Sequence, residues 1–527
     1  MAETKREIER KYESDDGGLP DLTGVIGVAA VLDRGVAELD ATYYDTADAR
    51  LLAASLTLRR RTGGSDAGWH LKFPVAPGVR DEIRAPLSDT LPRALAGLIR
   101  SHVRDAELAP VVRLRSARDV RHLVDDEGRL LAEVSVDTVR ADRLTGDGGS
   151  ARWTEIEVEL ADGGDPDFLD KVDKRLRKAG VRPSGSASKL ARAIAETEPG
   201  RKRRAKARPK ARQDGKPAAG ANASVTPVTA GANASVTPVT AGDHVLVFLR
   251  AQRAAIIGLD PAVRRDLPRS VHRMRVATRR MRSAFRSHAK VLDRTVTDPI
   301  GEELKWLAGE LGVDRDQEVL TDRLTTALDA LPRPLVTGPV RNRLRAWARP
   351  HGGGSRRHLV AVLDGERYLA LLATLDRLVD EPPLLPAAAR APEKVLAKAV
   401  RKDFGQVAAL VEETLGQPPG AGRNLALHDA RKKVKRTRYC AETAAPALGG
   451  PAADLVRLMK SLQDLLGDHQ DSVMTREALC DLAARAHAAG ESAFTYGVLY
   501  AREERRAELV EAALPEAWES IGAAMAV

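Results

Sequence analysis

The sequence predicts a chain of the α+β class in two parts: an antiparallel β-barrel or tunnel with flanking helices, then an all-α helical bundle made of two repeats. Short strands with charged residues two positions apart run to about residue 198. Long Ala-, Leu- and Arg-rich segments that repeat a basic motif begin at residue 243. A chain of 527 residues is too long for one ordinary core. We therefore expect domains at 1–198 and 243–527, joined by a linker at 199–242.

The first predicted strand contains Glu7-Ile8-Glu9-Arg10-Lys11. Because side chains alternate along a strand, Glu7, Glu9 and Lys11 share one face. Two carboxylates and an ammonium suit a wet interior that holds a metal and an anion together. A solvated edge strand or a first helical turn is the alternative for this stretch alone.

Further strands follow with the same spacing of charges. They are expected at residues 41–46, 55–61, 68–73, 81–86, 111–115, 133–137 and 155–159. Helices are expected from Asp21 to Leu32, with Asp21 as N-cap, from Pro166 to Ala179, and from Lys189 onward.

Apolar residues such as Leu58, Leu71 and Ile156 occupy the opposite strand faces and need a core of their own. A closed sheet with outer helices satisfies both faces, because its apolar side packs under the helices and its charged side lines the lumen. Buried like charges are costly unless divalent cations compensate the carboxylates and phosphates compensate the bases. The expected lumen groups are the acids Glu7, Glu9, Asp137, Glu155 and Glu157 and the bases Lys11, Arg59, Arg61, Lys72, Arg113 and Arg115.

Six ordered motifs in residues 3–198 resemble the CYTH domain, also called the triphosphate tunnel metalloenzyme family. They are Glu7-x-Glu9-x-Lys11, Tyr44-Asp45-Thr46, Leu58-Arg59-Arg60-Arg61, Trp69-His70-Leu71-Lys72, Glu155-Ile156-Glu157 and Ser188-Lys189. The resemblance implies a β-tunnel that binds Mg²⁺ or Mn²⁺ and a triphosphate. It implies metal ligands at Glu7, Glu9, Asp137, Glu155 and Glu157, and catalytic roles for Glu7, Glu9 and Lys11. The implied triphosphate contacts are Lys11, Arg59, Arg61, Lys72 and Lys189. A further contact is implied in the stretch from Arg113 to Arg118, where Arg113 and Arg115 are the candidates and the matching arginine is left open.

The predicted linker contains a basic run at Arg201–Lys216 and an exact tandem repeat that begins at Gly220 and again at Gly231. Such composition is typical of a solvated tether. Binding of a polyanion by the basic run is the alternative.

The helical half contains a second internal repeat. His272, Arg275, Arg279 and Arg282 stand at the same spacing as His428, Arg431, Lys435 and Arg438, and Lys305 answers Lys460 further on. The spacing i, i+3, i+7, i+10 places each set on one helix face. Two matching basic stripes predict a duplicated module with one positive groove.

Residues 243–520 resemble the CHAD domain, a polyphosphate-binding helical module. The resemblance implies that the ten residues of the two stripes, His272, Arg275, Arg279, Arg282, Lys305, His428, Arg431, Lys435, Arg438 and Lys460, line a polyphosphate groove.

Composition agrees with a polyanionic partner, since the formal net charge is +10. Neither a signal peptide nor an apolar run long enough for a membrane span is visible, and the two cysteines, Cys440 and Cys480, form no disulfide framework. We expect a cytoplasmic location, with association to polyphosphate granules left open. Aromatic residues make up only 3%, which disfavours nucleic-acid binding.

The leading hypothesis is a divalent-metal-dependent triphosphatase, acting on inorganic triphosphate or a related triphosphate and tethered to a polyphosphate-binding domain. Adenylate cyclase activity of the CYTH type is the enzymatic alternative. The non-catalytic alternative is a scaffold in which both halves only bind polyphosphate. The acidic residues Glu7, Glu9, Glu155 and Glu157 argue against it, because a site for a polyanion alone gains nothing from carboxylates.

Overall fold

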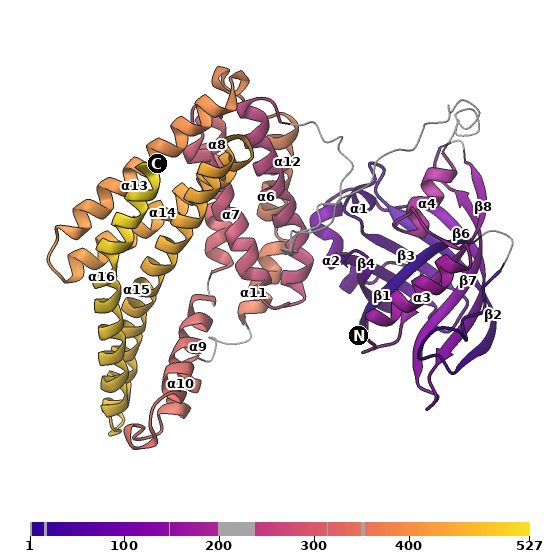
Figure 1. Cartoon of the computed structure of the whole chain (residues 1–527), viewed down its shortest axis with the longest axis horizontal. Coiled ribbons are helices and arrows are strands. Elements are labelled where there is room, and N and C mark those ends of the chain that lie inside the picture. Colours follow the sequence, from indigo (N-terminus) through magenta and orange to yellow (C-terminus); the bar gives the residue numbers. More distant parts are fainter. Residues whose placement is uncertain are drawn as a thin grey trace. The chain divides into compact units, whose positions relative to one another are not determined.

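The computed structural model describes residues 3–14, 18–146, 148–198, 238–312, 315–348 and 354–526. The chain forms two compact units, residues 1–234 and 235–527 (Figure 1). The predicted linker, with its basic run and tandem repeat, lies outside the described residues up to residue 237. Within the described part, no helix has the length and apolarity needed to span a bilayer.

The N-terminal unit is built on one antiparallel sheet that closes on itself. Its strand order is β5-β4-β3-β2-β6-β7-β8-β1-β9, and a further pairing of β5 with β1 completes the ring (Figure 1). The elements are β1 (Glu3–Ser14), β2 (Ala30–Asp45), α1 (Arg50–Ala53), β3 (Thr57–Thr62), β4 (Gly68–Ala76), β5 (Val79–Pro86), α2 (Arg93–Val103), β6 (Ala109–Val124), β7 (Leu130–Arg143), β8 (Ser150–Leu160), α3 (Asp167–Lys178), β9 (Arg182–Pro183) and α4 (Lys189–Glu196).

The apolar outer face of the sheet is covered by helices, as the strand pattern predicts. On α3, Phe168, Val172 and Leu176 form one stripe and pack against Ile156 and Val158 of β8. On α2, Leu95 and Ile99 pack against Leu58, Leu71 and Ile83 of β3, β4 and β5. Because alternate residues serve this outer core, the intervening charged residues are directed into the lumen.

The helix α4 has a different position: it packs on the inner side of the sheet. Its Leu190 and Ala193 join a core with Tyr43, Leu114 and Trp153. This core fills the lumen at one end, and Lys189, the first residue of α4, reaches the charged interior beyond it. A side chain of Ser188 accepts a hydrogen bond from the Ala191 amide at 3.1 Å and caps the helix.

The predicted helix from Asp21 to Leu32 is wrong. The Asp21 carboxylate does cap the Thr23 amide at 2.9 Å, but the chain continues in turns, with Gly27 at φ +97°. From Ala30 the backbone is extended and pairs with β6 along almost its whole length. The many sheet hydrogen bonds and the β-branched residues outweigh an isolated N-cap signal.

The C-terminal unit is all helical, as predicted. Its elements are α6 (Ala241–Arg264), α7 (Ser270–Ser287), α8 (Arg294–Glu310), α9 (Arg315–Asp329), η2 (Arg333–Leu335), α10 (Val340–Ala348), α11 (Gly354–Asp364), α12 (Glu366–Asp380), η3 (Pro386–Ala389), α13 (Pro392–Leu415), α14 (Ala421–Leu448), α15 (Gly450–Ala488) and α16 (Phe494–Ala526). The main core joins both repeats, with Met274 and Met281 of α7 beside Leu427 and Val434 of α14.

Candidate functional site

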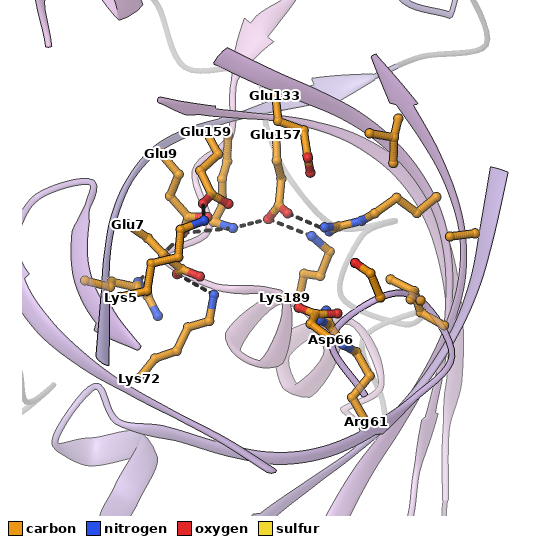
Figure 2. Close-up of a pocket in the computed structure, with 18 of the residues that line it drawn as sticks. Lys5, Glu7, Glu9, Arg61, Asp66, Lys72, Glu133, Glu157, Glu159 and Lys189 are labelled. Atoms are coloured by element: carbon orange, nitrogen blue, oxygen red, sulfur yellow. Dashed lines mark hydrogen bonds and ion pairs between the residues drawn. The ribbon is translucent and has the colours of Figure 1, made fainter. Parts of the chain in front are cut away.

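The lumen forms a cavity of about 630 Å³ whose wall is charged over most of its circumference. Figure 2 shows Glu7, Glu9, Glu157 and Glu159 along one arc of the wall, with Lys72 and Arg61 on the facing arc. Glu7 and Glu9 are only 2% and 8% exposed, so the first strand does direct its acids inward. The edge-strand and helical alternatives for this stretch are therefore excluded.

Three acids from two neighbouring strands converge at the wall of the cavity, which Glu157 lines, while Asp137 and Glu155 are buried beside it. Carboxylate oxygens of Asp137, Glu155 and Glu157 lie within 4.8 Å of one another. Lys189 Nζ lies 2.9, 2.8 and 2.6 Å from these three groups in that order. Three hard oxygen donors at this spacing fit Mg²⁺ or Mn²⁺.

Cations hold two acids of this cluster, Glu157 and Asp137, in the ionised form. Burial favours the neutral acid, but Lys11, Lys189 and Arg118 outweigh it and hold the pKa of Glu157 well below its ordinary value. The same holds for Asp137: burial raises its pKa, but Lys189 and Arg118 outweigh burial, and the pKa of Asp137 is lowered. Glu157 and Asp137 are thus negatively charged at neutral pH, which a divalent cation requires of its ligands.

Glu155 is fixed from the closed end of the lumen. The indole Nε1 of Trp153 donates a hydrogen bond of 2.6 Å to its carboxylate. Arg192 of α4 lies over the Trp153 ring and 3.7 Å from the same carboxylate. The plug helix therefore positions one acid of the cluster as well as supplying Lys189.

Glu7 and Glu9 lie in a second acidic group rather than in the three-carboxylate cluster. Lys72 Nζ bridges Glu7 at 2.5 Å and Glu82 at 3.4 Å. Burial, and then the neighbouring Glu82, raise the pKa of Glu7. Lys11 joins the two groups, because it lies 3.2 Å from Glu9 and contacts Glu157.

Glu82 connects several of the predicted phosphate-binding cations. It is fully buried, and it contacts Lys72, Arg84 and, at 3.5 Å, Arg59. His70 Nδ1 lies 2.9 Å from it as well. The sequence places Glu82 and Arg84 on one strand face, but the alternating pattern does not identify Glu82 as the common partner of cations on β3 and β4.

Arg113 and Arg115 are a wrong prediction, because they lie on the exposed face of β6. They pair there with Asp40 at 2.5 Å and Asp142 at 2.6 Å. The arginine of this stretch that lines the cavity is Arg118, an odd number of residues away, which contacts Asp137 at 2.6 Å and Glu157 at 2.9 Å. The even-numbered residues of β6 face the lumen, and a stretch with arginines at both parities does not reveal which set does.

The remaining predicted bases line the cavity. Arg59, Arg61, Lys72, Lys11 and Lys189 are all part of its wall. Burial, then Arg59 and Arg118, lower the pKa of Arg61 to about 9, so Arg61 is a desolvated cation among other cations. Additional charged groups of the wall that the motifs do not include are Lys5, Arg34, Asp66, Arg80, Arg84, Glu133, Glu159 and Asp162.

The helical unit brings part of the two basic stripes together. Lys435 of α14 lies among Arg431, Arg279 and Arg438, and burial followed by the first two lowers the pKa of Lys435 to about 7. The Nε atoms of the three arginines are buried and have no hydrogen-bond partner among the described residues. Two acids lie beside the cluster: Asp471 is near Arg431 and Lys435, and Glu442 contacts Arg280 and lies 3.5 Å from Arg438.

The two repeats also share the position of one arginine side chain relative to a glycine. A Cβ on Gly312 would lie 3.1 Å from Arg275 Nη2, and one on Gly467 would lie 3.4 Å from Arg431 Nη2. Each guanidinium therefore lies against a glycine of the following helical segment. This supports the repeat that the sequence predicts.

Other members of the stripes do not join the buried cluster. Lys305 and Lys460 are at least half exposed and pair with Glu302 and Asp464 on their own helices. Arg282 is half-buried, and burial, followed by repulsion from Arg286, lowers the pKa of Arg282. The two histidines differ, since His272 is exposed whereas His428 is partly buried. Burial and Lys432 lower the pKa of His428.

Comparisons with known proteins agree with both halves. A CYTH domain model matches residues 5–194 and a CHAD domain model matches residues 248–480. Two uncharacterized proteins of Mycobacterium tuberculosis, from strains CDC 1551 and H37Rv, are each 38% identical over 530 aligned positions, covering 96% of this chain and 95% of theirs. The chain therefore belongs to the family of proteins in which a CYTH domain precedes a CHAD domain.

Solved structures resemble each half separately. PptA from Streptomyces chartreusis aligns with 53% of this chain and 99% of its own, at a TM-score of 0.46 and 21% identity. The CHAD domain from Ricinus communis aligns with 55% of this chain and 96% of its own, at 0.41 and 23%. A Hippeastrum protein described as having a dominant triphosphatase activity aligns with 37% of this chain and 98% of its own, at 0.23 and 18%.

The position of Lys189 inside the acidic cluster leads to a test of metal binding. In Lys189→Met, three buried carboxylates lose a shared counter-ion, so we expect a lower Tm in EDTA. Mg²⁺ or Mn²⁺ should restore more of the Tm than in the unmodified protein, because the cation takes over the same charge. Thermal melts with and without each metal measure this. Lys178→Met, at an exposed position of α3, is the control. Equal metal responses in all three proteins would contradict a cation site at Asp137, Glu155 and Glu157.

Proposed function

We propose that the N-terminal unit is a divalent-metal-dependent hydrolase of inorganic triphosphate or a related triphosphate, and that the helical unit binds polyphosphate. One observation carries the first part: a cavity lined by lysines and arginines is also lined by Glu157, which belongs to a buried cluster of three carboxylates. A site for a polyanion alone gains nothing from buried carboxylates, whereas a site for a metal and a polyanion together requires both.

The basic side chains would bind the phosphate chain. Arg59 and Arg61 stand two residues apart on one face of β3, and Lys72 faces the same space from β4. Guanidinium groups donate paired hydrogen bonds to phosphate oxygens, and ammonium groups act as point charges. These groups are already desolvated, so they stabilise the charge that develops on phosphoryl oxygens without reorganising.

Asp137, Glu155 and Glu157 would hold Mg²⁺ or Mn²⁺. A divalent cation, when bound there, supplies Lewis acidity toward phosphoryl oxygens. Lys189 and Lys11 share the same carboxylates, and they would turn toward the substrate's oxygens as the acids accept the cation. The charge in the cavity is thereby balanced in both states.

Glu7 is the group that we propose as proton acceptor for the attacking water. Its pKa is raised by burial and Glu82, which brings its basicity closer to that useful near neutral pH. Lys72, 2.5 Å away, orients its carboxylate. Glu9 and Lys11 complete the proposed catalytic set by linking this acid to the three-carboxylate cluster.

In the helical unit, the cluster of Arg279, Arg431, Lys435 and Arg438 supports polyphosphate as ligand. Its cations outnumber the acids beside them, and burial together with repulsion by Arg431 and Arg279 lowers the pKa of Lys435 to about 7. A linear polyanion would relieve this repulsion and provide acceptors for the buried arginine Nε groups.

Removing the proposed proton acceptor tests the hydrolase. In Glu7→Gln, phosphate release from tripolyphosphate with Mg²⁺ or Mn²⁺ should fall about 10²–10⁴-fold, the usual contribution of a general base, while the Tm changes little. Glu127→Gln, which removes the same charge from an exposed hairpin, should keep the full rate. A Glu7→Gln protein as fast as the unmodified one would contradict the assignment.

Removing four cations tests the helical site. The full chain with Arg275→Ala, Arg279→Ala, Arg431→Ala and Lys435→Ala should lose long-chain polyphosphate affinity and show a shallower salt dependence, because fewer counterions are exchanged. Its helix content and tripolyphosphate hydrolysis should persist. Alanine at the exposed Arg294, Arg457, Arg485 and Arg505, which also removes four positive charges, is the control. Equal losses in the two variants would show that binding depends on net charge alone.

The lowered pKa of Lys435 predicts a pH effect on the same binding. Below about pH 7 the ammonium is already charged; above it, binding must take up a proton, so polyphosphate affinity should fall as pH rises from 7 to 8.5. Isothermal titration calorimetry in buffers of different ionisation enthalpy measures the proton uptake. Lys435→Arg stays charged throughout and should lose this pH dependence. If Lys435→Arg keeps it, another group is responsible.

A further inference from the structure

The loop between β3 and β4 places the carboxylate of Asp66 against Arg61, one of the cations proposed to bind the substrate. Asp66 forms an ion pair with Arg61 and lies 3.8 Å from Arg84 (Figure 2). Arg59 and Arg118 are close positive neighbours of Arg61, and their effect on its pKa outweighs that of Glu82. Its Nε atom is buried and has no hydrogen-bond partner within the described part of the chain. Asp66 thus supplies the negative charge that this desolvated guanidinium needs.

The loop is shaped to hold Asp66 in this position. Gly63 and Gly64 precede it with φ of +81° and +68°, values that favour glycine. A Cβ on Gly63 would lie 2.0 Å from the Glu38 carbonyl oxygen, and one on Gly64 would lie 2.8 Å from Leu39. His70 Nε2 lies 2.9 Å from the backbone carbonyl of Asp66. The two glycines let the loop lie close on β2, and His70 fixes its end.

Asp66 stands toward the open end of the cavity. The opposite end is filled by α4 and its core, whereas Val36 and Leu130, which are 65% and 41% exposed, line the end that includes the loop. Along β3, Arg61 lies two residues from Arg59 toward this end, a distance of about 6.6 Å for an extended strand. A ligand held by the inner cations reaches Arg61 only if it is a chain of phosphates.

We propose that Asp66 is a specificity-determining residue that occupies the outermost phosphate subsite, so that only an anion long enough to reach Arg61 displaces it. This rests on the proposed triphosphate site. The carboxylate stands in for a phosphate oxygen in the free protein, and the incoming phosphate exchanges with it on Arg61. A single phosphate binds the inner cations and leaves the Asp66–Arg61 pair intact.

The test measures binding rather than turnover, in the full chain that carries the four helical alanine substitutions so that only the tunnel binds. Asp66→Asn should lower the Kd for tripolyphosphate about tenfold, because the ligand no longer competes with a charged internal partner. The Kd for orthophosphate should stay within about twofold. Titration calorimetry with each anion, and a Tm measurement to confirm folding, give these values.

Asp162→Asn is the matched control, because Asp162 lines the same cavity and is exposed. Its loss changes the charge of the open end without releasing Arg61, so it should affect both anions alike and weakly. A chain-length-dependent gain in Asp66→Asn alone supports the proposal. No gain, or an equal gain for both anions, overturns it.

The outcome is separable from that of the proposed hydrolase. If tripolyphosphate binds more tightly to Asp66→Asn but is never hydrolysed by the unmodified protein, the role of Asp66 stands and the proposed reaction fails. If hydrolysis is observed and the Asp66→Asn Kd is unchanged, the role of Asp66 fails and the reaction stands.

Discussion

Compensation of charge inside the closed sheet is the constraint on which the N-terminal unit depends. A carboxylate buried without a partner would be neutralised or would destabilise the fold by several kcal/mol. Here each acid of the lumen faces at least one cation: Glu7 and Glu82 share Lys72, and Asp137, Glu155 and Glu157 share Lys189. The apolar cores on the outer face stabilise the closed sheet. The ion pairs on its inner face offset the cost of burying charged side chains there.

The same pairing explains how such an interior could admit ligands. A metal and a polyanion that enter together bring opposite charges, and each can exchange with an internal partner of its own sign. Lys189 is the internal stand-in for the metal, and Asp66 is the one that we propose for a phosphate. The free and the occupied cavity then differ little in net charge, so binding need not desolvate an uncompensated ion.

The helical unit follows the opposite rule. Arg279, Arg431 and Lys435 lie close together, and burial followed by repulsion from the two arginines lowers the pKa of the lysine. The apolar core beneath, with Met281 and Val434, supports them without neutralising them. Such a surface suits an anion that arrives without a metal, whereas the tunnel suits a metal and an anion. If both proposed functions hold, the two units would bind the same class of anion in different forms, one with a metal and one without.

Much of this could be predicted from the sequence because alternation is a property of the strand itself. Charges at Glu7 and Glu9, or at Arg59 and Arg61, must share a face whatever the rest of the fold does. What alternation cannot give is the choice between the two faces when both contain arginines, and this is why the sequence does not distinguish Arg118 from Arg113 and Arg115. It also cannot give contacts between distant strands, such as those of Glu82, since these depend on closure of the ring.

Local signals failed where long-range pairing decides the structure. Asp21 has the side chain of a good N-cap, but the following residues gain more from the pairing of β2 with β6 than from a helix. Lys189 shows the converse. The local sequence predicts a helix that begins at Lys189. The position of that helix inside the lumen, where Leu190 and Ala193 pack at one end, depends on closure of the sheet.

This plug has a consequence for the proposed reaction. Because α4 packs into one end against β2, β6, β7 and β8, on the proposed function a phosphate chain would enter and leave by the end that Asp66 lines. The cavity would then act on a short chain or on the terminus of a longer one. The helical cluster, which lies on helices α7 and α14 and is closed by no such plug in the described structure, has no comparable limit on length. Short and long polyphosphates would therefore be handled by different halves of this chain, for a reason that lies in the topology of each half.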